Sequence, residues 1–438
     1  MGLNFKQRYK NHIFLIIFLL LCFGMIFTDL PIYEKTVTHS IMIFVTSFVF
    51  PFILILNNFK IKPLTKNLKL FILYILLTFT ISLLILFSFF ISKQELYFYD
   101  KNLLNKHFEA FISLSLIHFF SYFLLVYSLS KLNFNLVKKV IYLFFVLLTI
   151  AAFIEYISPE KLNIFHSYLK NYERLRLFAL EPSQAVVIYS VFSFMSLYFS
   201  NNNFFKFIIL FFSLIVFILI GSKGAFITLI LTLTIVFVYV LRNVMYIFVV
   251  LMVFVVIVYI FVNYILPSLL IDIEKFTSFS TRFSGIISVF LILFTYPFGL
   301  GYGSYIALYP DILHKSYEIA NSFIFSLFNI HLSNVEILDI ITTGKYIGAK
   351  SGIPQSIVFT GWIGLIFWLM ILKNTKSYIN ALRMSQYQKL ILRLTTLFIF
   401  IQLLIGSEYT LLYVIWLPIA FVEVEYYKQN RRIGYNEI

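Results

Sequence analysis

The sequence predicts an all-α polytopic membrane protein that crosses the bilayer about twelve times. Of the 438 residues, 61% are hydrophobic and only 12% are charged, and the mean hydropathy is +0.94. A soluble domain carries roughly twice that charged fraction. The apolar residues come in runs of about 17 to 25, the length that a helix needs to cross the hydrocarbon core. The Lys and Arg residues cluster between alternate runs, as they do in the cytoplasmic loops of membrane proteins.

The spans are expected where apolar runs are bounded by charged or turn-forming residues. The first run follows a basic start, Met1 to Lys10, and no small-residue cleavage pattern appears at Thr28 to Pro31, so we expect an uncleaved first span. In chain order, the predicted spans are 12–28, 38–57, 68–92, 108–130, 137–156, 182–200, 204–221, 224–241, 244–265, 354–372, 388–406 and 409–425.

The basic residues also orient the chain, because Lys and Arg are retained on the cytoplasmic side of a membrane. With the N- and C-termini both cytoplasmic, most of the 34 Lys and Arg lie in inner segments, together with only three of the 19 acids, Glu423, Glu425 and Glu437. The formal net charge of +15 then faces the anionic inner leaflet. The charge therefore predicts the lipid bilayer as a partner and needs no nucleic acid to explain it.

One outer segment is too long to be a simple turn. It separates residues 1–265, with spans 1 to 9, from residues 354–438, with spans 10 to 12 and a cytoplasmic tail, and it covers residues 266–353. Its apolar stretch Ile286 to Tyr296 is short for a span, so we expect an interfacial or re-entrant helix there. Loops of this length are usually functional.

Basic residues near the outer surface are candidates for anion binding. Arg174 and Arg176 come shortly before Glu181, and a guanidinium group offers a planar fork to phosphate oxygens. Lys223 lies where the eighth span begins, and the free backbone N–H groups of a helix start favour anions. The alternatives are an interfacial anchor pair with a helix start at Pro182, and an ordinary glycine-flanked turn at Lys223.

The long outer loop adds a further cation and a glycine-rich turn. Arg282 precedes the apolar stretch, and Gly299, Gly301 and Gly303 follow it. Glycines let a backbone approach a ligand closely and adopt positive φ. The pattern is not a dinucleotide-binding fingerprint, because no strand precedes it.

Histidines and carboxylates supply the candidate bases. His314 and His331 lie in the long loop and titrate near neutral pH, although a lone loop histidine is usually a surface residue. Glu408, in the outer turn between the last two spans, is expected to have an ordinary loop role. No two histidines have ligand spacing with a carboxylate, and Cys22 is the single cysteine, so neither a metal site nor a disulfide framework is predicted.

Taken together, these segments resemble the O-antigen polymerase family of oligosaccharide repeat unit polymerases, which is related to the O-antigen ligases. The resemblance covers about residues 170 to 372, and the N-terminal third matches only by hydropathy. The matching elements are Arg174 and Arg176 with Glu181-Pro182-Ser183, Ser222-Lys223-Gly224, Arg282 with Pro297-Phe298-Gly299-Leu300-Gly301-Tyr302-Gly303, and Lys350-Ser351-Gly352 with Thr360-Gly361-Trp362-Ile363-Gly364.

The resemblance implies a metal-independent glycosyltransferase without a cofactor, in the bacterial inner membrane. It would join undecaprenyl-pyrophosphate-linked repeat units into O-antigen, capsule or exopolysaccharide at the periplasmic face, which makes the loop between spans 9 and 10 periplasmic. A chain-length regulator protein is a further candidate partner. Pyrophosphate leaves as an anion, so the site needs fixed positive charge and a base for the acceptor hydroxyl.

In this interpretation, the residues take two roles. Glu181 is the first candidate for the base and His331 is the second. The candidates for binding pyrophosphate or substrate are Arg174, Arg176, Lys223, Arg282, Gly301, Gly303 and Lys350.

Two alternatives remain open. The ligases place a histidine ahead of the tenth span, where this chain has Lys350-Ser351, and this departure favours a polymerase over a ligase while leaving the base in doubt. A lipid-linked oligosaccharide flippase or other transporter is the alternative from another class, because twelve spans are also a common transporter plan. A transporter would be expected to have buried charges at mid-membrane and a long inner loop in the middle of the chain.

Overall fold

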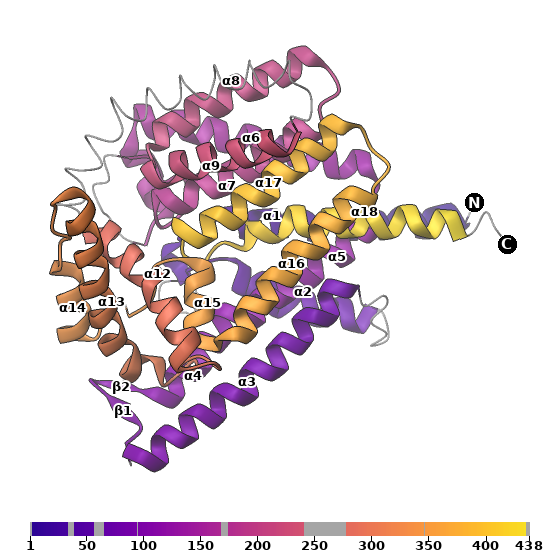
Figure 1. The fold of residues 1–438 in the computed structure, drawn as a ribbon. Helices are drawn as coiled ribbons and strands as arrows, with labels where there is room; N and C mark the ends of the chain where they lie inside the picture. The colour runs from indigo at the N-terminus through magenta and orange to yellow at the C-terminus, as the bar shows by residue number, and fades with distance from the viewer. Residues whose placement is uncertain are drawn as a thin grey trace.

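The computed structural model describes residues 2–33, 39–56, 65–93, 95–167, 174–240, 277–345 and 347–434, and most of these are helical. Figure 1 shows the arrangement. The α-helices are α1 (Gly2–Ile26), α2 (Met42–Leu56), α3 (Lys66–Lys93), α4 (Leu103–Phe111), α5 (Ile117–Lys131), α6 (Phe134–Ile157), α7 (Pro182–Phe199), α8 (Asn203–Ile220), α9 (Lys223–Val240), α12 (Thr277–Thr295), α13 (Tyr305–Phe328), α14 (Val335–Thr343), α15 (Gly352–Thr360), α16 (Trp362–Ala381), α17 (Gln386–Ile405) and α18 (Trp416–Gly434).

Short elements complete the described part of the chain. A hairpin of β1 (Tyr97–Phe98) and β2 (Lys101–Asn102) pairs Tyr97 with Asn102 and Phe98 with Lys101. A π-helical turn, Ile112–Leu116, joins α4 to α5. Three 3-10 helices lie at Pro31–Tyr33, Pro159–Phe165 and Tyr413–Ile415.

The all-α prediction is confirmed, and six of the described helices are long and apolar enough to cross a bilayer. These are α3, α4 with α5, α6, α7, α8 and α17. Large apolar side chains lie exposed on several of them, with Leu76 62%, Phe204 67% and Ile218 61% exposed. Extensive exposed apolar surface is rare on soluble proteins and common on surfaces that face lipid. The chain therefore has the helices and the surface of a membrane protein.

Helix ends lie within about five residues of most expected spans, because charged and turn-forming residues end the apolar runs. The first and last spans differ: α1 begins at Gly2 instead of residue 12, and α18 covers Trp416–Gly434 instead of 409–425. Asn133 and Asn202 cap α6 and α8 through their side chains, and a capping box of Ser385 and Gln388 opens α17. The predicted ninth span, 244–265, lies outside the described residues.

The segments that the charge pattern assigns to the cytoplasm meet at one end of the bundle, here called the basic end. Lys428 Nζ donates to Leu132 O at 3.1 Å, which joins α18 to the α5–α6 turn. Lys206 Nζ lies 4.3 Å above the ring of Tyr387, which joins the start of α8 to the start of α17. Both termini lie on this side in Figure 1.

The opposite end, here called the outer end, carries α12, α13, α14 and the hairpin (Figure 1). There Ser407 Oγ donates to Ser183 O at 2.9 Å, and Gly352 N donates to Ser407 O at 2.8 Å. Three connections far apart in sequence are thereby joined. The described part of the segment expected to be a long loop, residues 277–345 and 347–353, is mainly helical, and α12 begins well before the apolar stretch that starts at Ile286.

The expected tenth span is broken into α15 and α16 at Gly361. Gly361 has φ +58°, and a Cβ placed on it would lie 2.1 Å from Pro297 O. Trp362 N donates to the same Pro297 oxygen at 2.9 Å. Only glycine fits this approach, so the turn around Pro297 sets the break. The apolar run itself carries no sign of it.

Candidate functional site

Five charged side chains from five separate elements or connections lie near one another at the outer end. This outer charged cluster consists of Glu181, Arg282, Glu336, Lys350 and Glu408. Lys350 Nζ lies 3.9 Å from Glu336 Oε1 and 3.9 Å from Glu408 Oε1, so it bridges two carboxylates. Three of the five, Glu181, Arg282 and Lys350, were expected site residues.

The backbone around Lys350 is held in an uncommon conformation. Lys350 has φ +54°, in the left-handed region that few non-glycine residues adopt. Ala349 N donates to Gln355 Oε1 on α15. A Cβ placed on Gly285 of α12 would lie 2.6 Å from Ala349 O, so α12 abuts this segment. Such conformations persist where the surroundings enforce them, often at functional sites.

The first turn of α7 brings Glu181 close to Glu408. Glu181 is the N-cap residue of α7, and Pro182 occupies the first helical position, where its fixed φ suits a helix start. Ser183 Oγ donates to Glu181 Oε2 at 3.3 Å, and the Ser183 carbonyl accepts from Ser407. Glu408 directly follows Ser407 in the sequence, so the carboxylates of Glu181 and Glu408 belong to one contact region.

A cavity of about 230 Å³ opens beside this cluster. Its lining includes Lys350, Gln355 and Glu408, together with Lys106 and Glu109 of α4. The π-helical turn supplies further lining, and π-helical turns inside helices are frequent at functional sites. Aromatic and small polar residues complete the wall, namely Tyr305, Phe359, Tyr409, Ser113 and Thr410. Aromatic faces combined with carboxylate, amide and hydroxyl groups suit a polyhydroxylated ligand.

The Glu408 carboxyl is suited to accept a proton. Burial raises its pKa above the ordinary value, Glu181 and Glu336 act in the same direction, and Lys350 and Arg282 oppose them. Although 40% of its side chain is exposed, that surface faces the cavity. Because the cluster has three carboxyl groups and only two cations, ionising the third carboxyl group costs free energy. A carboxyl with a raised pKa is the better general base near neutral pH.

Arg174 and Lys223 form a second positive region at the outer end. A Cβ placed on Gly221, in the turn before α9, would lie 3.9 Å from Cγ and from Cδ of Arg174. The exposed Arg174 side chain therefore lies along the turn that carries Lys223. Residues 174–181 connect this region to the outer charged cluster.

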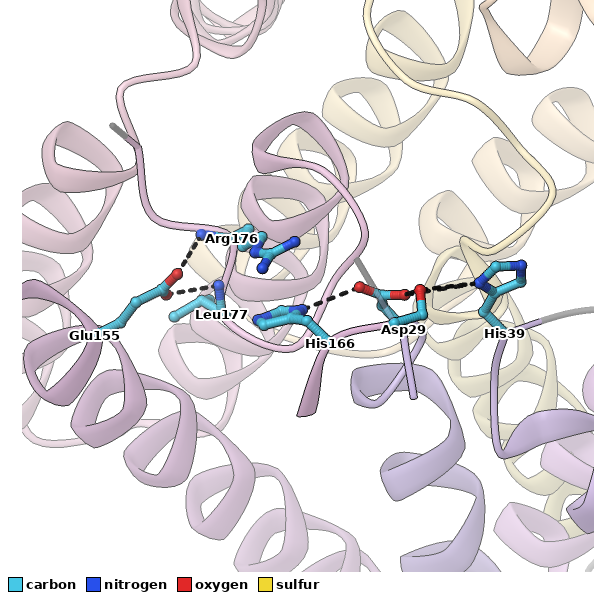
Figure 2. A network of polar contacts seen from close by, with 7 residues as sticks. Asp29, His39, Glu155, His166, Arg176 and Leu177 are labelled. Carbon is cyan, nitrogen blue, oxygen red and sulfur yellow. Dashed lines mark hydrogen bonds and ion pairs between the residues drawn. The ribbon is translucent and has the colours of Figure 1, made fainter. Parts of the chain in front are cut away.

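Arg176 differs from Arg174 in being buried. Figure 2 shows Glu155, near the end of α6, facing the backbone N–H groups of Arg176 and Leu177, which donate at 3.0 and 2.7 Å. Leu177 has φ +53°, so this carboxylate stabilises a strained backbone. Glu155 thereby determines the path of the segment between Arg174 and Glu181.

A buried histidine–aspartate group anchors the preceding residues (Figure 2). Asp29 is fully buried; its carboxylate lies 3.1 Å from His166 Nδ1 and 3.7 Å from His39 Nδ1, and it accepts from Ser167. Although burial acts to raise the Asp29 pKa, hydrogen bonds from His166, His39 and Ser167 hold the pKa of this carboxyl well below its usual range. The ionised carboxylate ties residues 166–167 to the connection between α1 and α2.

The expected substrate glycines, Gly301 and Gly303, lie in close backbone contacts. Gly301 has φ +76°, and its N–H donates to Phe359 O at 3.0 Å. A Cβ placed on Gly303 would lie 2.4 Å from Leu103 O. Packing of the turn against α15 and α4 accounts for both glycines.

His331, the second candidate base, lies away from the cluster. It is exposed in the α13–α14 connection, with its ring 4.5 Å from that of Phe325 and its Nδ1 3.4 Å from Asn321 Nδ2. In the described part of the chain, no contact joins it to Glu408 or Lys350. The same ranges hold no group of three His, Cys, Asp or Glu able to bind a metal.

No protein-family model matches this chain, and no curated protein does.

From the sequence, Glu408 was expected to have an ordinary loop role, and Glu336, Glu155 and Asp29 were not singled out. One signal was available, because the chain has only 19 Asp and Glu and carboxylates next to apolar spans are seldom without a role. The scarcity of carboxylates does not identify the partners of these residues, because partners such as Glu408 and Lys350 belong to connections far apart in the sequence.

Proposed function

We propose that the protein is a glycosyltransferase that joins polyprenyl-pyrophosphate-linked oligosaccharide repeat units at the outer face of the bacterial inner membrane. The observation that carries the proposal is the cavity beside Glu408, with the Glu408 carboxylate next to Lys350. The proposed topology keeps twelve spans and cytoplasmic termini, with 244–265 as the ninth span. Its support is the meeting of the basic segments at one end of the bundle.

The two charged regions take different parts of the substrates. The outer charged cluster has three carboxylates and two cations, so it is a poor site for a pyrophosphate. Arg174 and Lys223 present positive charge beside α8, whose surface is largely apolar and exposed. We therefore assign the donor pyrophosphate to Arg174 and Lys223, with its lipid tail in the bilayer, and the acceptor sugar to the cavity.

The proposed reaction is a single displacement. The acceptor hydroxyl oxygen attacks the anomeric carbon of the donor sugar, a new glycosidic C–O bond forms, and the bond to the pyrophosphate oxygen breaks. Glu408 takes the hydroxyl proton, and the polyprenyl pyrophosphate leaves with the bonding electron pair. One base and a direct displacement imply inversion at the anomeric carbon. Lys350 orients the Glu408 carboxylate, and Arg282 contributes positive charge to the same region.

The test is reconstitution of the purified protein in liposomes with lipid-linked repeat units as the only substrate. A ladder of multimers on a gel is expected. Glu408→Gln should lower the initial rate by about 10²- to 10⁴-fold, the usual contribution of a general base. Glu160→Gln, the same change at an exposed outer 3-10 helix, should leave the rate unchanged.

The same assay separates the candidate bases and the alternatives. Glu181→Gln should have a smaller effect than Glu408→Gln, because the Glu181 carboxylate already accepts a hydrogen bond from Ser183 Oγ at the start of α7. The reverse order would return the base to Glu181. If folded protein with intact substrate gives no ladder, the polymerase is rejected. Two functions then remain: transport of the lipid-linked oligosaccharide, or ligation to an acceptor that the assay does not contain.

A further inference from the structure

A second cavity, of about 100 Å³, lies at the basic end, at the opposite end of the bundle from the outer charged cluster. It is bounded by the start of α3, the last turns of α5 and the middle of α18. Its lining includes Thr65, which directly precedes α3, Leu68 from α3, Phe123 and Lys131 from α5, and Lys428 from α18. The proposed glycosyl transfer makes no use of this cavity.

The ammonium groups of Lys428 and Lys131 line the cavity, and both can still donate hydrogen bonds to an anion. Lys428 Nζ donates to Leu132 O at 3.1 Å and to Glu425 Oε1 at 3.3 Å. An ammonium group has three donors, so one is left. Lys131 Nζ lies 5.9 Å from the centre of the Tyr127 ring, a contact that uses no N–H bond to oxygen.

Among the described residues, Glu425 is the one carboxylate that pairs with a lysine of the cavity. Glu423 is fully buried, and it accepts from Thr65 Oγ1, from Asn67 N and from the hydroxyls of Tyr122 and Tyr378. These hydrogen bonds come from the side of the protein core and stabilise the Glu423 carboxylate. Glu425 pairs with Lys428 alone among the cavity lysines. Ser130, Tyr127 and Tyr427 also line the cavity.

The cavity also has an apolar side. Leu68 and Phe123 line it, and α3 continues from it as a surface with Leu73 and Leu76 54% and 62% exposed. α2 packs against the same helix α5, with the Phe50 ring 5.3 Å from that of Phe123. A polar pocket continuous with apolar, lipid-facing helices fits a molecule with a charged head and hydrocarbon chains.

We propose that this pocket binds the phosphate of an anionic phospholipid from the leaflet at the basic end, with Lys131 and Lys428 as its cationic contacts. Basic pockets between membrane helices are typical sites for anionic head groups. A free phosphate offers the same oxyanion, but it would leave the apolar side of the pocket unused.

The test is native mass spectrometry of the full-length protein, titrated in detergent with phosphatidylglycerol, with phosphatidylcholine or with inorganic phosphate. The wild type should hold phosphatidylglycerol more tightly than phosphatidylcholine. Each lysine at an anionic head group is worth roughly fivefold in affinity. Lys131→Gln with Lys428→Gln should therefore weaken phosphatidylglycerol binding by about thirtyfold.

A matched control removes the same charge elsewhere at the basic end. Lys139→Gln with Lys373→Gln changes two exposed lysines outside the pocket and should weaken binding by less than about twofold. Lys131→Gln alone, which loses only a ring contact, should weaken it about fivefold and guards against misfolding of the double variant. Equal losses in the two double variants would overturn the pocket, and displacement of the lipid by free phosphate would overturn the lipid assignment.

Discussion

Replacement of Gly303 by alanine distinguishes a packing role from a ligand-binding role for the glycine-rich turn. The new Cβ would lie 2.4 Å from Leu103 O and 3.1 Å from His107 Cβ. Carbon and oxygen normally approach to about 3.3 Å, so the turn and α4 must separate by almost 1 Å. Leu103 is fully buried, and Asn102 caps α4 through bonds to Leu104 N and Asn105 N, so α4 cannot move freely.

The expected cost is near the upper limit for overpacking, about 3 kcal/mol. Thermal unfolding in detergent, followed by circular dichroism or intrinsic fluorescence, should show a midpoint lower by a few degrees. Activity should fall with it, because α4 carries Lys106 and Glu109 of the cavity wall.

Gly224→Ala is the matched control. A Cβ there meets no atom within 4 Å, and Gly224 lies in the first turn of α9. Its unfolding midpoint should stay the same or rise slightly, because alanine is favoured over glycine in helices by roughly 0.5–1 kcal/mol. If Gly303→Ala unfolds like the wild type but loses activity, the packing explanation is refuted and the glycine serves the ligand.

Two further predictions concern the base and the helix break. Lys350→Gln should move the acid limb of the rate–pH profile to higher pH. The active base is the deprotonated Glu408 carboxylate, so activity is lost as the pH falls through the Glu408 pKa. Lys350 lowers that pKa, and its removal therefore raises the pH at which activity is lost. Glu336→Gln should move the limb the opposite way, and initial rates between about pH 4 and 8 that show no opposed movement would contradict the role of Glu408. Gly361→Ala should cost more than Gly303→Ala, above about 3 kcal/mol, because φ is +58° and its Cβ would lie 2.1 Å from Pro297 O. A wild-type unfolding midpoint for this variant would show that the helix break can relax.

Much of the candidate site could be named from the sequence, but its working arrangement could not. Arg174, Lys223, Arg282 and Lys350 stand out because charges are scarce in an apolar chain. The division of these cations between two regions depends on contacts such as that between Arg174 and Gly221. Lys350 was expected to bind pyrophosphate, whereas the structure places it between two carboxylates. The sequence alone put Glu181 first and His331 second as the base and gave Glu408 an ordinary loop role, because nothing in a linear chain shows that Glu408 lies beside Lys350.

The sequence by itself determined the helices and the grouping of the connections. Hydrocarbon thickness sets the length of an apolar run, and backbone groups in lipid must bond within the helix, so local residues suffice to predict α3, α6 or α17. The tertiary structure alone decided the break at Gly361, the pairing of Lys350 with Glu408 and the cavity beside them. Each of these features depends on atoms from distant parts of the chain. Tertiary packing brings these atoms together, and no local sequence pattern records it.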